Sequence, residues 1–143
     1  MTSPELERLV QIGTLKREPG AQAEIDGLVH SGRSRLTDAK HQALALESRF
    51  DLAYNAAHAL SLAALRWWGY RSDNRYIAFQ AIPHTLGLGP GVWRVLATCH
   101  QRRNAFEYEG YLEVDERLLT DLLNAAEAVY EAMLGLGPVS EER

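Results

Sequence analysis

The sequence predicts an all-α protein, an antiparallel bundle of about five to six helices. Apolar residues recur at alternating three- and four-residue steps in the long segments, as they do when one face of a helix is buried. No segment alternates with the two-residue period of a half-buried strand. Capping and helix-breaking residues stand between the periodic segments. We therefore expect one domain over residues 1–143.

The first predicted helix begins with a cap residue, Ser3, followed by Pro4 at the first helical position. The segment 13–20 interrupts the chain, and a second helix follows at about 22–42 with apolar residues on one side of a polar cylinder. We assign both helices to an N-terminal region, 3–42, that precedes a core at about 48–134.

The third predicted helix is the central one. Ser48 with Asp51 fits a capping box, and Gly69 is a suitable left-handed stop after the helix. Alanines along the segment allow neighbouring helices to approach closely. Its seam consists of Phe50, Ala53, Ala57, Leu60, Ala64 and Trp67.

Three further helices complete the predicted bundle. Asp73 or Asn74 caps a short helix through Ile82, which Pro83 and the glycines after it end. Pro90 opens the fifth helix, and the last covers about 115–134. The tail 137–143 is expected to be frayed.

Composition limits the functional classes. The chain has 143 residues, of which 46% are hydrophobic, enough for one buried core. A net charge of −4 means that any nucleic-acid contact must come from a local basic patch. The single cysteine forms no internal disulfide, and no apolar run is long enough to cross a bilayer. The start lacks the pattern of a secretory signal, so we expect a cytoplasmic protein with no membrane association.

Arg103 interrupts the apolar seam of the fifth helix, between Cys99 and Phe106. A buried guanidinium needs a partner, because leaving it unpaired costs several kcal/mol or more. It can pair with Glu107 one turn later or with Asp51 on the third helix, extend to water, or face a cleft that receives an anion.

Other residues extend the candidate site. His100, Arg103 and Glu107 share one helix face, which offers a base, an anion clamp and an orienting acid. His58 is a second-rank candidate and is more often a buried, hydrogen-bonded histidine. No histidines or acids recur at metal-ligand spacing, so we expect no metal, and no cofactor is predicted.

The segment 66–76 interleaves three arginines, Arg66, Arg71 and Arg75, with four aromatic residues. Such a mixture can stack on bases and hold phosphates, and Arg102 would add to it. The alternative is structural, because arginines near a helix C-terminus complement its dipole and tryptophans fill cores.

The stretch "RRNAFEYEG", together with "AYNAAHAL", "GY" and "IPHTLG", resembles the HEPN family of small helical-bundle proteins. The resemblance covers roughly 48–134. Many family members are metal-independent ribonucleases of toxin or defence systems that act as dimers. The resemblance maps the motif arginine to Arg103, the polar residue to Asn104 and the motif histidine to Tyr108.

Tyrosine is a poor base at neutral pH, so the resemblance implies weak or absent ribonuclease activity. It also implies a homodimer that binds RNA or a nucleotide, with an antitoxin or nucleotidyltransferase-type protein as a possible partner. Two alternatives stay open: an active ribonuclease with another base, and a noncatalytic protein-interaction module in which Arg103 pairs with an acid.

Overall fold

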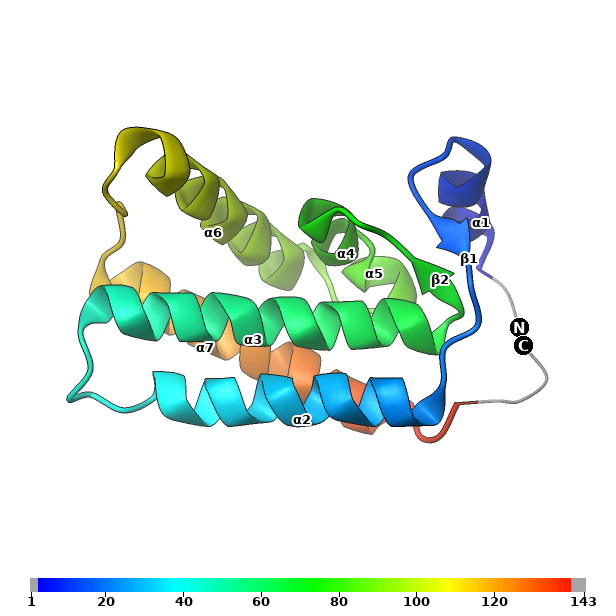
Figure 1. Ribbon diagram of the computed structural model, residues 1–143, viewed down its shortest axis with the longest axis horizontal. Helices are drawn as coiled ribbons and strands as arrows, with labels where there is room; N and C mark the ends of the chain where they lie inside the picture. Colours follow the sequence, from blue (N-terminus) through cyan, green and yellow to red (C-terminus); the bar gives the residue numbers. More distant parts are fainter. Residues whose placement is uncertain (1–2, 140–143) are drawn as a thin grey trace.

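The computed structural model describes residues 3–139 and is an all-α helical bundle. Seven helices and one two-stranded ribbon make up the described part of the chain (Figure 1). The elements are α1 (Pro4–Gln11), β1 (Lys16–Arg17), α2 (Gln22–Ala39), α3 (Leu46–Trp67), β2 (Tyr70–Arg71), α4 (Arg75–Gln80), α5 (Ile82–Thr85), α6 (Pro90–Glu109) and α7 (Glu116–Leu134).

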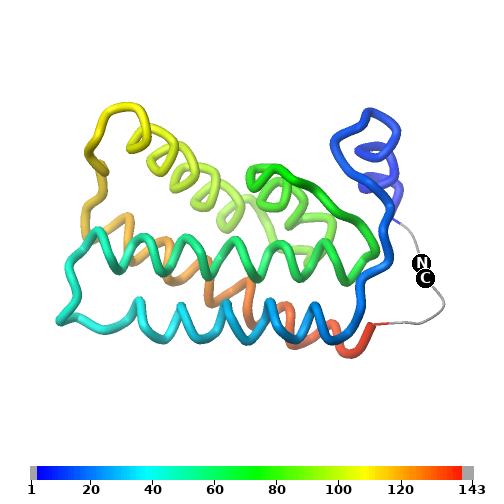
Figure 2. The backbone as a smooth tube through the Cα atoms, in the orientation of Figure 1, coloured from blue at the N-terminus to red at the C-terminus, as the bar shows by residue number. Residues whose placement is uncertain are grey.

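Four long helices, α2, α3, α6 and α7, form the body of the bundle, and consecutive ones run in opposite directions (Figures 1 and 2). The central position predicted for α3 is confirmed, since it packs against α2 along its length and also against α7. The main core contains Phe50 and Leu60 of α3 together with Leu36 and Ala39 of α2. The expected core at about 48–134 was therefore too short, because α2 belongs to it.

The two ends of α3 differ in how well the sequence predicts them. Gly69 follows the helix with a φ of 89°, the left-handed conformation that its sequence position predicted. The predicted capping box was wrong: α3 begins two residues before Ser48, and its cap, Ala45, makes no side-chain hydrogen bond. The helix extends further because Leu46 packs against the core.

The segment predicted as a break between the first two helices contains a short strand. Lys16 pairs with Arg71, and Arg17 with Tyr70, in an antiparallel ribbon that the period-two pattern could not detect because each strand has two residues. A second apolar cluster lies under this ribbon and includes Leu6, Leu15 and Leu65. It fastens α1 to the end of α3.

The predicted cap of α4 is confirmed at Asn74, and α7 begins with a side-chain cap as well. The Asn74 side chain accepts from the Tyr76 amide at 2.8 Å, and the Asp115 carboxylate accepts from the Leu118 amide at 2.8 Å. One expectation was wrong: Pro83 does not end a helix but lies in the first turn of α5, where proline is tolerated. Pro90 does open α6.

The end of the chain contacts the bundle as far as it is described. The Val139 amide donates to the Gln22 side chain at 2.6 Å, and the Trp67 indole donates to the Gly137 carbonyl at 3.1 Å. The expected fraying from residue 137 is therefore not seen at 137–139, and residues 140–143 lie outside the described part.

Candidate phosphate-binding site

Polar side chains of α3, α4 and α6 meet around the buried ring of Tyr54, which is 1% exposed. The phenol oxygen of Tyr54 lies 2.9 Å from Nδ1 of His100 on α6. Phe79 of α4 packs edge-on against the same ring, with 5.8 Å between centroids. The capped start of α4 places Arg75 and Tyr76 beside this group. Three segments remote in sequence thus converge on one surface.

The protonation of Tyr54 follows from its surroundings. Burial raises the pKa of its phenol, while Arg75 and Arg103 act in the opposite direction without reversing the shift. The phenol therefore stays protonated at neutral pH and serves as a hydrogen-bonding support for His100.

His100 is held at both ring nitrogens, because Asn104, one helical turn later, places its amide nitrogen 3.1 Å from Nε2. An amide nitrogen only donates, so Nε2 is the acceptor and Nδ1 carries the proton that faces the Tyr54 oxygen. Burial and then Arg75 lower the pKa of His100 below its usual value. The imidazole is therefore neutral at pH 7, with its basic nitrogen covered by an exposed side chain.

Arg75 is the exposed cation of this surface. Its guanidinium lies 5.7 Å from the centroid of the Tyr54 ring and donates to the Asn55 side-chain oxygen at 3.1 Å. It forms no ion pair with any carboxylate within residues 3–139. Its charge is therefore available to an external anion.

Arg103 does pair with an acid, and the acid is Asp51. The two side chains approach to 3.3 Å, at exposures of 31% for Arg103 and 51% for Asp51. The guanidinium also lies 5.8 Å from the centroid of the Phe106 ring. It lines an open pocket of about 480 Å³ that also contains Glu47. The Arg103 guanidinium is thus partly exposed but already paired. The carboxylates of Asp51 and Glu47 in the same pocket weaken its attraction for phosphate.

The trio of His100, Arg103 and Glu107 does not assemble. His100 bonds to Tyr54 and Asn104, Arg103 turns to α3, and Glu107 is exposed and forms no ion pair within the described chain. The physical reason is that Arg103 meets a carboxylate on the facing helix, which leaves the weaker same-helix pairing unused.

The three residues that the HEPN resemblance groups together also separate. Arg103 faces Asp51 and Asn104 faces His100, while Tyr108 is 90% exposed near the end of α6. Tyr108 makes no hydrogen bond with His100 or Arg103 within residues 3–139.

The other candidate arginines bind groups of the chain itself. Arg66 is 3% exposed, so the expectation that it faces nucleic acid does not agree with its position. Its guanidinium donates to the backbone oxygens of Glu18, Pro19 and Tyr70. Arg71 pairs with Glu18 and with Glu24.

Arg102 pairs with Glu113 at 3.1 Å. Of the five arginines expected to bind nucleic acid, Arg75 is the one without a carboxylate partner in the described chain.

Two groups near the site, the buried Cys99 and the half-buried His58, are unreactive. Cys99 is a core residue, as predicted, and burial raises the pKa of its thiol to about 12. Burial lowers the pKa of His58 to about 4, with Arg75 and His100 adding to the effect. His58 is half-buried, packs edge-on against Phe79 and is neutral at pH 7.

Within residues 3–139 there is no group of three or more His, Cys, Asp or Glu side chains suited to a metal ion. No helix in the same range has the length and apolar character needed to cross a membrane. Comparison of the chain with family models, with curated proteins and with solved structures gives no match. The site therefore has to be interpreted from its own geometry.

The sequence missed the supporting residues Tyr54, Asn55 and Tyr76. Tyr54 and His100 are 46 positions apart, so no local pattern links them. One local signal was available, because Tyr54 precedes His58 by one helical turn on α3.

Proposed function

We propose that this protein binds a phosphate group of RNA or of a nucleotide at the surface formed by Arg75, His100 and Asn104. The observation that carries the proposal is the Arg75 guanidinium, which is exposed, held by Asn55 and lacks an acid partner within the described chain. A planar guanidinium matches two phosphate oxygens in a bidentate geometry. The Asn104 amide, which bonds to His100, carries a second N–H that offers a further donor on α6.

We expect the protein to bind RNA with weak or absent cleavage because of the position of His100. A general base must present a free acceptor nitrogen to the proton that it removes. Here Nε2 already accepts from Asn104, and Nδ1 is committed to Tyr54. Tyr108, which stands at the motif histidine of the resemblance, projects into solvent instead.

The wider setting in this proposal comes from the HEPN resemblance. In this setting the protein is a cytoplasmic homodimer. It belongs to a toxin–antitoxin or defence system and has an antitoxin or a nucleotidyltransferase-type protein as its partner. The helical bundle is compatible with it. In an isologous dimer of the kind that the resemblance implies, the two copies of Arg103 would meet, each beside its own Asp51.

The test is the affinity of a fluorescent single-stranded RNA for the wild type, Arg75→Ala and Arg35→Ala. Arg35 is an exposed arginine on α2 whose loss changes the net charge equally. We expect Arg75→Ala to weaken binding about tenfold, as for a charge-assisted hydrogen bond, and Arg35→Ala to change it little. Equal affinities of all three proteins, or no binding at all, would favour the protein-interaction module.

A second candidate, an active metal-independent ribonuclease, is favoured by one observation. The acceptor nitrogen of His100 is covered by a single exposed side chain, Asn104, which bound RNA could displace. Cleavage of RNA in the presence of a chelator, abolished by His100→Gln and by Arg103→Ala, would establish this activity in place of simple binding.

A further inference from the structure

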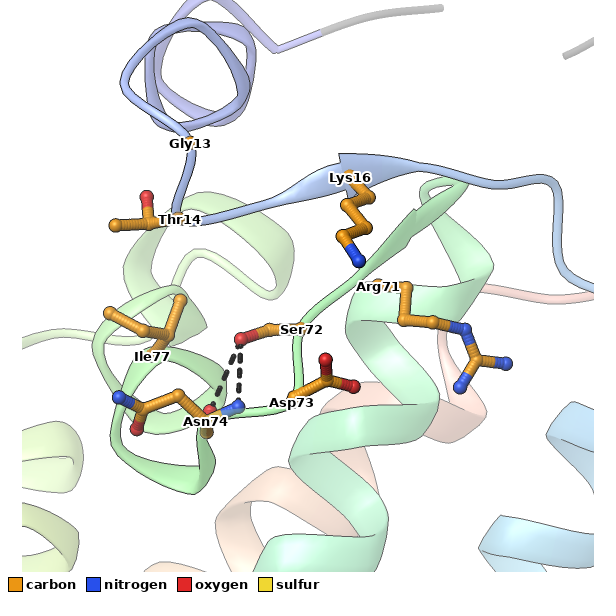
Figure 3. A pocket seen from close by; sticks show the side chains of 8 residues that line it. All are labelled: Gly13, Thr14, Lys16, Arg71, Ser72, Asp73, Asn74 and Ile77. Carbon is orange, nitrogen blue, oxygen red and sulfur yellow. Dashed lines mark hydrogen bonds between the residues drawn. The ribbon is translucent and has the colours of Figure 1, made fainter.

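A pocket of about 350 Å³ lies between the turn after α1 and the loop from β2 into α4, next in sequence to Arg75 and Tyr76. Its volume is within the range of sites for small molecules. Gly13 and Ile77 supply apolar wall, and Figure 3 shows the polar side chains around it. The lining also includes Thr14, Lys16, Arg71, Ser72, Asp73 and Asn74.

Two opposite charges line this pocket without pairing. Neither the Lys16 ammonium nor the Asp73 carboxylate forms an ion pair or a side-chain hydrogen bond in the described part of the chain. Each acts at longer range on a neighbour, Lys16 on Glu18 and Asp73 on Arg71. In Figure 3 the Lys16 amine points from β1 toward the loop that carries Asp73.

The remaining polar groups of the pocket are already used. Arg71 turns away from it toward Glu18 and Glu24, as Figure 3 and its ion pairs agree. Ser72 is bonded to the backbone of Asn74, and the Asn74 oxygen caps α4. The unsatisfied features are therefore one cation, one anion and an apolar wall at Ile77.

We propose that this pocket binds a small zwitterion, a free α-amino acid with an apolar side chain. Its carboxylate would face Lys16, its ammonium would face Asp73, and its side chain would pack against Ile77. A simple anion such as phosphate fits less well, because Asp73 repels it.

Matched ligands test this without changing the protein. Amide chemical shifts over residues 13–16, a pocket segment that contains none of the residues of the Tyr54 surface, would be followed by NMR during titration with leucine, N-acetylleucine and leucinamide. The two analogues lack the ammonium and the carboxylate, respectively. We expect both to bind about two- to fivefold more weakly than leucine, the effect of losing one solvent-exposed ion pair.

The variants Lys16→Met and Asp73→Asn should each remove the advantage of leucine over one analogue, N-acetylleucine for Asp73→Asn and leucinamide for Lys16→Met. Both side chains are exposed, so the fold should tolerate the changes. At residues 13–16, equal shifts with leucine and inorganic phosphate, larger shifts with adenosine monophosphate than with leucine, or no shifts with any probe would overturn the proposal. Because the followed amides exclude Arg75 and its neighbours, these outcomes are distinguished from phosphate binding at Arg75.

Discussion

Replacing Arg66 by methionine should destabilise the fold strongly, although arginine is normally a surface residue. The Nη1 atom of this buried guanidinium donates to the backbone oxygen of Glu18 at 2.7 Å and to that of Tyr70 at 3.0 Å. Its Nη2 atom donates to the oxygen of Pro19 at 3.2 Å. Its Nε atom lies 3.2 Å from the Glu24 carboxylate. One side chain thus joins α3, the ribbon and the segment that leads into α2.

The magnitude follows from how buried each acceptor is. The bond to Tyr70 is fully buried, and an unsatisfied buried acceptor costs about 1–3 kcal/mol. The other two carbonyls are partly buried and should cost about 0.5–1.5 kcal/mol each. The carboxylates of Glu18 and Glu24 are 49% and 35% exposed, so water replaces much of what they lose. Methionine keeps the packing of the stem, which leaves an expected loss of about 3 kcal/mol.

Urea denaturation followed by far-ultraviolet circular dichroism measures this loss, with Arg71→Met as the matched control. Arg71 contacts the same two acids but is 42% exposed, so its replacement should cost less than about 1 kcal/mol. Equal destabilisation by the two variants would refute the reasoning. It would mean that the Arg66 guanidinium does not hold these segments together.

Three further predictions concern packing, pH and the exposed tyrosine. Gly32→Ala should destabilise by about 1–3 kcal/mol in the same assay, because its Cβ would lie 2.6 Å from a Leu60 side-chain carbon. Gly27→Ala, with open space, should instead stabilise α2 by about 0.5–1 kcal/mol. Because the folded-state pKa of His58 is lowered to about 4, stability is lost as pH falls below its unfolded value near 6.5. Between pH 7 and pH 5 the wild type should lose about 2 kcal/mol more than His58→Leu, and parallel profiles would contradict this. Tyr108→Ala should leave both stability and RNA affinity unchanged, and a marked loss of affinity would restore Tyr108 to the site.

Helix periodicity and caps predicted most of the bundle because they are local. Pro90, Asn74 and Gly69 each act within one turn of a helix end, and the structure confirms all three. The ribbon of β1 and β2 escaped prediction because its two strands come from segments more than 50 positions apart. The start of α3 escaped for a related reason, since packing of Leu46 rather than a side-chain cap extends the helix.

In the candidate site, too, local features were predictable from the sequence and contacts between remote segments were not. The interruption of the α6 seam by Arg103 was visible in the sequence, and Asp51 was one of the partners considered. Which arginine keeps a free charge was not visible, because it depends on acids brought near Arg66, Arg71 and Arg102 by folding. In the sequence Arg75 is equivalent to the other four arginines expected to bind nucleic acid. The ion pairs of those four in the folded chain distinguish it from them.

The most direct test of the central claim is the salt dependence of RNA binding by the wild type and by Arg75→Ala. A phosphate contact displaces counterions, so the logarithm of the association constant falls with the logarithm of salt concentration at about 0.7 per contact on a single strand. We predict a steep slope for the wild type and a slope shallower by about that amount for Arg75→Ala. Identical slopes for the two proteins would show that Arg75 does not bind phosphate.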